Sequence, residues 1–357
     1  MINYIQIKNF KSIRKVEMEL KPINIFIGAN GAGKSNFIGF FKLLKNIYEK
    51  SLNIYTAEEM GADNILHFGS KQSDHLSGRV EFNNTNGYEF KLLRDQGDRF
   101  FFEYEHSLFH KKEYLDWYIE SFGEGYAESK LIDSMRPVAK HVRNYFESFK
   151  IFHFHDTSTT AKIKRTSNIN DNWFLKEHGE NLAAFLNFLQ ITNPNEFKRI
   201  EMVVRSVAPY FERFNLQPDR INSDIIRLEW KEKGSDQYFN AKHLSDGTLR
   251  FIALATLLLQ PQKPQVIIID EPELGLHPFA ISKLAGLIKK ASASSQIILS
   301  TQSVNLIDYF EPEDIITVDR KEGQSVFKRQ NSEELKDWLE NYTISDLWNK
   351  NVIGGRP

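Results

Sequence analysis

The pattern of apolar and polar positions predicts that the first hundred residues are mostly β-structure around one helix. Residues 16–20 alternate between apolar and acidic side chains, which is typical of a strand with one face in water. Residues 23–27 are almost wholly apolar, as in a strand buried on both faces. After Lys34 the apolar positions recur at helical spacing, and a meander of strands follows between residues 80 and 104.

The rest of the chain predicts helices first and then an α/β layer. From residue 105 to about 210 the pattern is mostly helical, interrupted by Phe-His-Phe at 152–154 and by a polar loop at 156–172. Beyond it we expect strands at 224–230, 266–269, 296–300 and 314–318, and helices from Thr248 and near 278–290. This alternation of helices and strands indicates the α/β fold class.

An octapeptide matches the phosphate-binding consensus G-x-x-x-x-G-K-[ST] at every position. It follows the buried strand directly and precedes the amphipathic helix. Its glycines let backbone N–H groups wrap around phosphate oxygens, and the helix N-terminus favours the same anion. We expect Lys34 to reach the β- and γ-phosphates and the Ser35 hydroxyl to bind Mg²⁺. The phosphate-binding candidates in this P-loop are Gly28, Asn30, Gly31, Ala32, Gly33, Lys34 and Ser35.

Two carboxylates follow the apolar strand at 266–269. Asp270 and Glu271 stand at the C-terminal end of that strand, where open α/β sheets bind their ligands. Asp270 is placed to hold Mg²⁺ through water, and Glu271 to polarise the attacking water as general base. An acidic pair after a strand is also common as surface capping, so this interpretation depends on the P-loop upstream.

Residues 244–248, Leu-Ser-Asp-Gly-Thr, open the helix that precedes this strand. Ser245 supplies a hydroxyl, and Gly247 permits the backbone to approach an anion closely. The alternative is a simple N-cap, because Ser-x-x-Thr before an apolar run is good capping chemistry.

In this order the motifs resemble those of an ABC-type ATPase head. The P-loop, a distant L-S-x-G motif and a strand that ends in Asp-Glu-Pro carry the likeness. The branch that the chain resembles contains RecF, the SMC proteins and the overcoming-lysogenization-defect ATPases. Asn36 and the opening Ile-Lys-Asn-Phe-Lys-Ser strengthen the match. Residues 244–249, 270–278 and 346–357 resemble stand-alone bacterial ATPases that lack a Toprim domain.

The resemblance implies an ATPase that two chains complete together. In such heads the signature serine and glycine of one subunit close over the γ-phosphate held by the P-loop of the other. Carried over to this chain, Ser245 and Gly247 act in trans, whereas the P-loop with Asn36 and the carboxylates of Asp270 and Glu271 act in cis. An ATP-dependent homodimer that uses ATP and Mg²⁺ is therefore expected.

Two positions depart from the family pattern. Where ABC heads usually carry a histidine that touches the γ-phosphate, this chain has Gln302, whose amide donates a hydrogen bond but carries no charge. We expect slower and less pH-sensitive hydrolysis, the alternative being that Gln302 only caps a strand. His277 stands where many members have aspartate, and it either reports across the dimer interface or caps the helix that begins at Pro278.

Two further segments keep several interpretations. His153, His155 and Asp156 form either a metal site, the start of a loop that couples the lobes, or plain structure. The basic run Lys162–Arg165 is either a solvated loop or a contact with a DNA backbone.

Composition narrows the classes of protein. The chain has no cysteine, which excludes disulfide scaffolds, thiol catalysis and Cys-ligated metals. Its 46 Lys+Arg and 47 Asp+Glu leave a net charge of −1, which argues against wholesale coating of nucleic acid or anionic membrane. Apolar runs fall far short of the ~20 residues of a membrane helix. We therefore expect a cytoplasmic protein without a membrane partner, and too few residues follow Asp270 to hold a Toprim nuclease domain.

We predict a P-loop ABC-type head with an antiparallel β lobe and an inserted helical lobe. Its parts are an ATPase lobe with the P-loop and β meander (1–104), a mostly helical insert (105–222) and a second ATPase lobe (223–357). The expected function is ATP hydrolysis by a homodimer. The homodimer is expected to drive or gate a DNA-directed partner or a separately encoded effector, such as a nuclease, in DNA repair or anti-phage defence. The alternatives are a very slow ATPase that acts as a nucleotide-gated scaffold, and a transporter subunit, against which the large insert argues.

Overall fold

A computed structural model describes residues 1–111, 113 and 116–355, and it divides the chain into two compact units. Unit 1 consists of Met1–Phe149 and Glu311–Pro357, and unit 2 of Lys150–Phe310. The P-loop therefore belongs to unit 1, whereas Leu-Ser-Asp-Gly-Thr and the two carboxylates belong to unit 2. The C-terminal segment that resembles stand-alone ATPases spans residues 346–357, and its last two residues, Arg356 and Pro357, lie outside the described residues.

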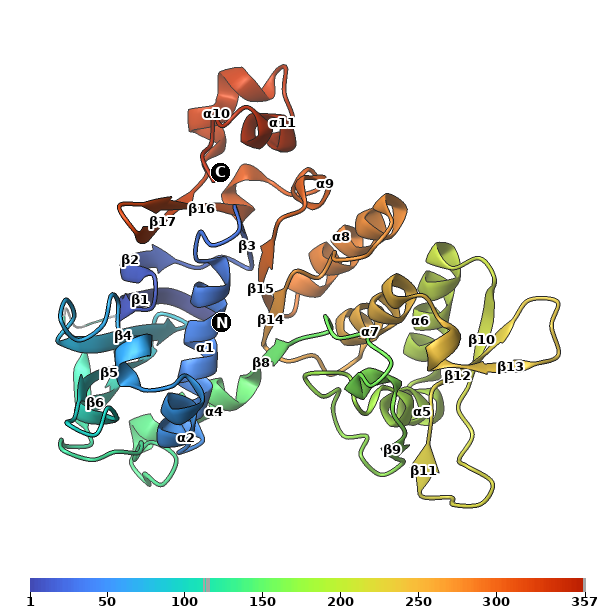
Figure 1. Cartoon of the computed structure of the whole chain (residues 1–357), viewed down its shortest axis with the longest axis horizontal. Coiled ribbons are helices and arrows are strands. Elements are labelled where there is room, and N and C mark those ends of the chain that lie inside the picture. Colours follow the sequence, from blue (N-terminus) through green and yellow to red (C-terminus); the bar gives the residue numbers. More distant parts are fainter. Residues whose placement is uncertain (112, 114–115, 356–357) are drawn as a thin grey trace. The chain divides into compact units, whose positions relative to one another are not determined.

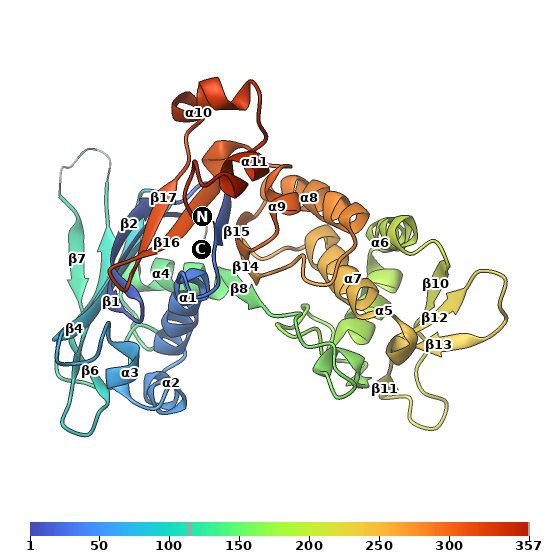
Figure 2. The same ribbon diagram turned by 45° about the horizontal axis from the view of Figure 1, so that its top comes forward.

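Unit 1 contains an antiparallel sheet whose described strands follow the order β2-β1-β4-β5-β6-β7 (Figures 1 and 2). Its strands are β1 (Ile2–Phe10), β2 (Ile13–Glu19), β4 (His75–Phe82), β5 (Asn86–Arg94), β6 (Phe100–Phe109) and β7 (Tyr118–Ser121). The predicted alternating strand and the meander are thus confirmed. Asn83 and Asn84, in the turn between β4 and β5, have φ of 51° and 57°, values that asparagine tolerates better than most residues.

Strand β6 differs from the prediction, which ended the β-structure at residue 104 and expected mostly helix from residue 105. The strand continues to Phe109 and pairs with β7 beyond it. The sequence pattern conceals this extension because two polar side chains, Glu105 and Ser107, are fully buried. Glu105 accepts hydrogen bonds from the hydroxyls of Tyr88 and Ser129 (2.7 and 2.5 Å), so its burial is compensated locally.

Four helices of unit 1 precede or follow these strands: α1 (Lys34–Tyr48), α2 (Leu52–Glu58), α3 (Ala62–Ile65) and α4 (Pro137–Ser148). Helix α1 is the amphipathic helix expected after the P-loop. Its apolar face is buried and includes Phe37, Phe40, Phe41 and Leu44. Figure 1 shows α1, α2 and α4 close together, and α4 contacts strands β5 and β6. These side chains fix the direction of the helix that starts at the phosphate-binding loop.

A second group of strands in unit 1 contains the strand before the P-loop. Strand β3 (Ile23–Gly28) is buried along its whole length, as predicted, and pairs in parallel with β16 (Ile315–Lys321). Strand β16 pairs antiparallel with β17 (Gln324–Arg329). The C-terminal segment adds a short 3₁₀-helix, η3 (Pro312–Asp314), and helices α10 (Ser332–Leu339) and α11 (Ile344–Asn349). Residues more than 280 positions apart therefore surround the P-loop.

Unit 2 combines a parallel strand pair with a layer of helices. Strand β14 (Val266–Asp270) pairs in parallel with β15 (Gln296–Thr301). The helices are α5 (Leu182–Thr192), α6 (Pro194–Val207), α7 (Asp246–Leu259), α8 (Pro278–Ser292) and the short α9 (Val304–Ile307). Figure 2 shows α6, α7 and α8 side by side, and contacts link each to the next. The predicted strands and helices after residue 248 are confirmed.

The rest of unit 2 consists of short strands and turns. The strands are β8 (Phe149–Phe152, whose first residue is the last of the N-terminal segment of unit 1), β9 (Ser167–Asn168), β10 (Phe211–Asn215), β11 (Ile225–Ile226), β12 (Glu229–Glu232) and β13 (Tyr238–Asn240). The 3₁₀-helices are η1 (Lys162–Lys164) and η2 (Ala241–His243). Within the described parts of the chain, no helix is both long enough and apolar enough to cross a membrane.

Candidate nucleotide-binding and hydrolysis site

The P-loop requires glycine at positions where its backbone packs against neighbouring atoms. A Cβ on Gly28 would lie 2.3 Å from the carbonyl oxygen of Val318 on β16. Gly33 has a φ of 115°, and its Cβ would lie 1.9 Å from Ser325 Oγ and 2.8 Å from Ser12 Oγ. Only glycine combines this backbone conformation with such close neighbours. The loop is therefore shaped by strand β16 and by two serines as well as by its own sequence.

Lys34 is buried and lies over the P-loop backbone. Its Nζ donates hydrogen bonds to the carbonyl oxygens of Gly28 and Ala29 at 2.7 and 3.0 Å. Ser35 is exposed at the start of helix α1, and the next residue, Asn36, donates its Nδ2–H to Ser12 Oγ at 2.7 Å. The predicted P-loop residues are thus brought together within unit 1.

The structure adds residues to the P-loop that the sequence reasoning missed. Ser12 and Ser325 share a hydrogen bond between their Oγ atoms (2.6 Å), and Ser325 Oγ donates to the carbonyl of Ala32 (2.5 Å). Arg320 donates from Nη1 to the carbonyl of Gly31 at 3.2 Å. Ser12 lies in a segment already singled out by resemblance, whereas no spacing rule points to Ser325 or Arg320, which reach the loop through the β16–β17 hairpin.

In unit 2 the two predicted carboxylates stand at the end of β14 beside strand β15. Ser300 pairs with Asp270 in the strand register and donates its hydroxyl hydrogen bond to Asp270 Oδ1. Glu271 has a φ of 39°, and its N–H donates to the carbonyl of Ser300 at 2.9 Å. Gln302 donates from Nε2 to Glu271 Oε1. The predicted base and the predicted glutamine are therefore in direct contact.

A third carboxyl group, that of Glu273, holds the end of strand β15 and the backbone of Gln302. It is 8% exposed, and its Oε1 accepts hydrogen bonds from Thr301 Oγ1 (2.5 Å) and from the backbone N–H of Gln302 (3.2 Å). Its Oε2 is buried and has no hydrogen-bond partner among the described residues. Burial raises the pKa of Glu273 above its ordinary value. The Asp-Glu-Pro-Glu sequence carries this residue, but its role was not predicted.

The Leu-Ser-Asp-Gly-Thr segment begins helix α7 as the sequence predicted. Ser245 is the N-cap, and its Oγ accepts the N–H of Thr248 at 3.2 Å. The capping interpretation is thus confirmed, and it leaves Ser245 exposed at the helix end. Gly247 packs on the segment after the carboxylates, because a Cβ there would lie 2.3 Å from the carbonyl oxygen of Gly275.

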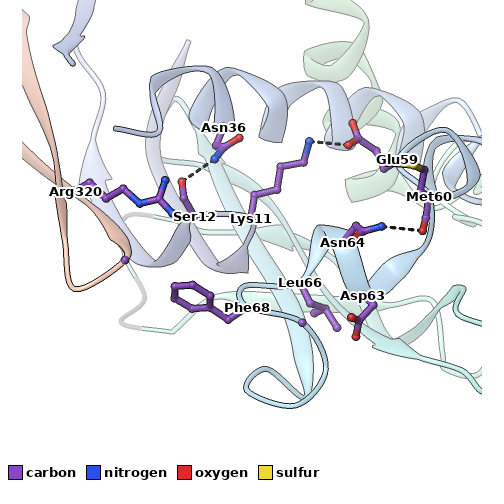
Figure 3. Close-up of a pocket in the computed structure, with 12 residues that line it drawn as sticks. Lys11, Ser12, Asn36, Glu59, Met60, Asp63, Asn64, Leu66, Phe68 and Arg320 are labelled. Atoms are coloured by element: carbon purple, nitrogen blue, oxygen red, sulfur yellow. Dashed lines mark hydrogen bonds and ion pairs between the residues drawn. The ribbon is translucent and has the colours of Figure 1, made fainter. Parts of the chain in front are cut away.

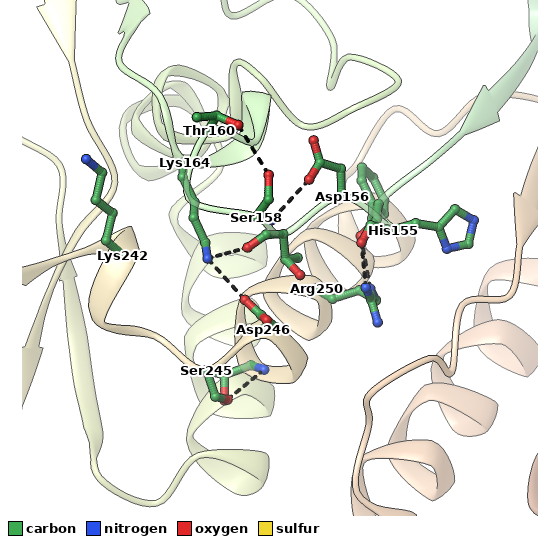
Figure 4. A network of polar contacts seen from close by, with 12 residues as sticks. His155, Asp156, Ser158, Thr160, Lys164, Lys242, Ser245, Asp246 and Arg250 are labelled. Atoms are coloured by element: carbon green, nitrogen blue, oxygen red, sulfur yellow. Dashed lines mark hydrogen bonds and ion pairs between the residues drawn. The ribbon is translucent and has the colours of Figure 1, made fainter.

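The loop after β8 is tied to helix α7 by two basic side chains (Figure 4). Buried Arg250 donates to the carbonyls of Phe154 and His155 at 2.9 and 2.8 Å. Lys164, whose side chain is only 7% exposed, donates to Asp246 Oδ1 at 3.0 Å and to a loop carbonyl. Lys164 thus differs from the solvated lysine that the basic run suggested.

The three residues at 153–156 separate in the structure. The rings of His153 and His155 lie 6.4 Å apart, and His153 stacks on His178 at 5.8 Å. Burial, followed by the charges of His178 and His155, lowers the pKa of His153. Asp156 is exposed and accepts the N–H of Ser158 at 3.0 Å. Across the described ranges no group of three or more His, Cys, Asp or Glu side chains could hold a metal ion.

His277 acts as a helix cap. Its Nδ1 accepts the N–H of Phe279 at 3.3 Å, at the N-terminus of α8. One of the two interpretations of this residue is therefore confirmed.

The fold is that of a P-loop ATPase head and resembles the heads of ABC and SMC ATPases. A family model described as "AAA domain, putative AbiEii toxin, Type IV TA system" matches residues 23–308, and the chain belongs to this family. The match identifies residues 23–308 as an AAA-type P-loop ATPase domain.

Curated relatives match shorter segments. The chain is 33% identical over 149 residues to a probable ABC transporter ATP-binding protein p29 of Mesomycoplasma hyorhinis, covering 39% of this chain and 54% of the relative. It is 37% identical over 70 residues to a putative ABC transporter ATP-binding protein of Methanosarcina mazei, covering 19% and 21%. With human ATP-binding cassette sub-family A member 6 the identity is 34% over 76 residues, covering 21% and 5%. The match spans less than two thirds of each of these relatives.

Two solved structures share the fold over nearly the whole chain. One is an SMC head bound to the C-winged helix domain of ScpA, with a TM-score of 0.61, 17% identity and coverage of 94% of this chain and 99% of that one. The other is an SMC head with an extended coiled coil from Pyrococcus furiosus, bound to the C-terminal domain of ScpA, with a TM-score of 0.60, 18% identity and coverage of 95% and 98%. The predicted fold class is confirmed.

Proposed function

We propose that this ATPase works as a homodimer in which each chain holds MgATP in its P-loop and its partner supplies Ser245 and Gly247 to the same triphosphate. The observation that carries the proposal is the exposed start of helix α7. Ser245 and Asp246 are exposed there. A helix N-terminus carries partial positive charge and free N–H groups, which favour a phosphate brought by another chain.

The P-loop has the chemistry to bind the triphosphate. Lys34 lies over the loop backbone, and the positive φ values of Gly31 and Gly33 (75° and 115°) suit a loop that turns its N–H groups toward an anion. Arg320, bound to the Gly31 carbonyl, adds a second cation beside the loop. We assign nucleotide binding to residues 28–36 on these grounds.

The donor set fits Mg²⁺, which prefers oxygen ligands, keeps several waters and usually binds through one or two carboxylates plus substrate phosphates. The Ser35 hydroxyl in unit 1 and the Asp270 carboxylate in unit 2 are each an oxygen donor of the kind that binds Mg²⁺. When bound, it would neutralise charge that develops on the transferred phosphoryl group. The hydrogen bond from Ser300 orients the Asp270 carboxylate for this role.

We assign proton transfer to Glu271. Its carboxylate takes a proton from the attacking water as the water oxygen bonds to the γ-phosphorus and the bond to the ADP oxygen breaks. Gln302 holds one oxygen of that carboxylate and so sets its direction. Glu273 in turn holds the backbone of Gln302.

A second candidate function is a very slow ATPase that acts as a nucleotide-gated scaffold. The contact between Gln302 and Glu271 favours it, because the amide of Gln302 occupies a carboxylate oxygen that would otherwise be open to the attacking water. In that case bound ATP, and not turnover, sets the state of the dimer.

For the partner, we propose a separately encoded effector, such as a nuclease or a toxin, in anti-phage defence or DNA repair. The likeness to the overcoming-lysogenization-defect and RecF group supports it, and so does a family described as a putative toxin of a toxin–antitoxin system. Exposed Lys162 and Arg165 support DNA as a further partner.

The test measures the rate of ATP hydrolysis and, by light scattering, the molecular mass of the protein in the presence of MgATP. We expect Lys34→Ala to lose ATP binding, and Glu271→Gln to bind MgATP, hydrolyse it slowly and double its mass in light scattering. Wild-type and Lys34→Ala proteins with equal phosphate-release rates would favour the scaffold. A Glu271→Gln protein that binds MgATP but stays monomeric would contradict the dimer.

A further inference from the structure

A cavity of about 420 Å³ lies in unit 2, and none of the residues assigned above to nucleotide or Mg²⁺ lines it. Three segments that are distant in the sequence contribute to its wall. They are the loop around η1 (159–166), the residues before strand β12 (227–228) and the end of β13 with η2 (240–242). The volume lies in the range of about 300–1,000 Å³ that is typical of sites for small molecules.

Every charged side chain among the described residues that line this cavity is basic. These side chains are Lys164, Arg165, Arg227 and Lys242. The pocket of unit 1 that Asn36 lines is different, because its wall includes the carboxylates of Glu59 and Asp63 (Figure 3). Like charges gathered in one concavity raise the local potential and concentrate ions of the opposite sign. The cavity of unit 2 therefore attracts an anion.

Two of the four cations have no internal counter-charge. Arg165 and Lys242 are exposed, and within the described ranges neither forms an ion pair. Arg165 donates from Nε to the carbonyl of Thr160 at 3.0 Å, which orients the guanidinium and leaves both Nη groups for a ligand. Lys242 stands in η2, where the side chain of Asn240 accepts its backbone N–H at 3.0 Å (Figure 4). Both cations thus stand on an ordered backbone before a ligand arrives, which lowers the entropy cost of binding.

The other two cations are paired with carboxylates that do not line the cavity. Lys164, whose side chain is 7% exposed, contacts Asp246 Oδ1 at 3.0 Å. Arg227 pairs with Asp219 and lies 3.6 Å from Glu229. A long polyanion that runs out of the cavity would approach these carboxylates, whereas a compact anion inside it contacts the cations alone. The distribution of charge therefore favours a compact ligand.

The chemistry of the wall favours phosphate. An arginine fork binds two phosphate oxygens at once, and a lysine ammonium adds a point charge. Two unpaired cations, with two more beside them, suit a ligand that carries more than one phosphate group. No aromatic side chain is present among the described residues of the wall, so a base would have no ring on which to stack.

We propose that this cavity binds a small phosphorylated molecule with two or more phosphate groups, held chiefly by Arg165 and Lys242. It is an anion site in addition to the P-loop, and it does not depend on the proposed function. It also differs from a DNA contact, because recognition is confined to one concavity with acidic side chains beyond it.

The test is titration calorimetry with inorganic tripolyphosphate as the probe. The parent protein is the full chain with Lys34→Ala, without divalent cations, so that the P-loop does not hold the probe. We expect Lys242→Ala to weaken binding roughly tenfold, the effect typical of losing one charge-assisted hydrogen bond. Lys242→Arg keeps the charge and retains the affinity. Because Lys242 is exposed and makes no ion pair among the described residues, Lys242→Ala keeps the parental melting temperature, which excludes misfolding as the cause.

The matched control is Lys198→Ala, which removes the same charge from an exposed lysine on helix α6 outside the cavity wall. We expect it to leave the affinity unchanged. A parent protein that does not bind tripolyphosphate would overturn the inference, and so would equal losses for Lys242→Ala and Lys198→Ala.

A single-stranded oligonucleotide is the second probe and separates the two sources of phosphate. If the oligonucleotide binds more tightly than tripolyphosphate, loses affinity with Lys242→Ala and shows the steep salt dependence of many phosphate contacts, the compact ligand is wrong and a nucleic-acid backbone takes its place. Weaker binding of the oligonucleotide than of tripolyphosphate supports the compact ligand. Neither result bears on the proposed function, because the P-loop is disabled in every protein compared.

Discussion

The contact between Gln302 and Glu271 leads to a prediction with a definite sign. Gln302→Ala removes a hydrogen bond from an amide to a charged carboxylate, an interaction of about 1.5–3 kcal/mol. If that bond orients the carboxylate only in the transition state, its whole loss appears in kcat. The change is then roughly 10- to 100-fold, with little change in KM.

The assay is phosphate release at saturating MgATP, with KM measured alongside. Gln302→Glu replaces the amide donor by a second carboxylate, and we expect it to slow hydrolysis further, because the two carboxylates repel each other and Glu271 loses the contact that sets its direction. Asn305→Ala is the matched control, since it deletes an exposed amide three residues further along the chain. We expect it to leave kcat unchanged.

The direction of the change decides between the two candidate functions. A fall in kcat supports Gln302 as the residue that positions the base. A rise would mean that Gln302 restrains the base, as in the nucleotide-gated scaffold. A Gln302→Ala enzyme with parental kcat would remove Gln302 from the site and leave it as a strand cap.

Other predictions concern stability and packing. Glu105→Ala leaves several buried donors without an acceptor, so we expect urea unfolding to show a free energy of unfolding lower by about 3–5 kcal/mol. We expect a smaller decrease for Glu105→Gln. A decrease under about 1 kcal/mol for Glu105→Ala would contradict this role. Gly247→Ala places a methyl group against the Gly275 carbonyl, and we expect about 1–3 kcal/mol of destabilisation and a loss of ATPase activity, whereas an unchanged melting temperature would show that the segments separate freely. The raised pKa of Glu273 means that the folded protein binds a proton at this carboxyl more tightly than the unfolded chain does. Protonated Glu273 therefore contributes to the free energy of unfolding at low pH, and this contribution is lost as pH rises from about 4.5 through the folded pKa. Glu273→Gln lacks this loss, so its melting temperature relative to wild type is expected to rise between pH 5 and pH 8 in scanning calorimetry, and a constant difference would contradict the assignment.

The local sequence was sufficient to predict those helices and strands whose signals lie within a few consecutive residues. The buried strand before Gly28, the helix after Lys34 and the strand that ends at Asp270 follow from apolar runs next to residues of fixed type. Glu105 shows the limit of this reasoning. Its side chain is polar and yet fully buried, so the apolar pattern of β6 is interrupted and the predicted strand ends too early.

The parts of the site that could not be predicted are made by distant segments. Ser325 reaches the P-loop from a hairpin near the end of the chain, and no spacing relates it to Gly33. The role of Arg250 likewise depends on which carbonyls lie beside helix α7.

The most direct test of a shared site is to mix two inactive variants. Lys34→Ala has no working P-loop but keeps Ser245, and Ser245→Arg blocks the signature position but keeps the P-loop. If each site combines the P-loop of one chain with Ser245 of the other, every mixed dimer has one complete site. An equimolar mixture then recovers roughly a quarter of wild-type ATPase activity if dimers form at random, and roughly a half if only mixed dimers form. A mixture as inactive as its two components, although mixed dimers form, would contradict the shared site.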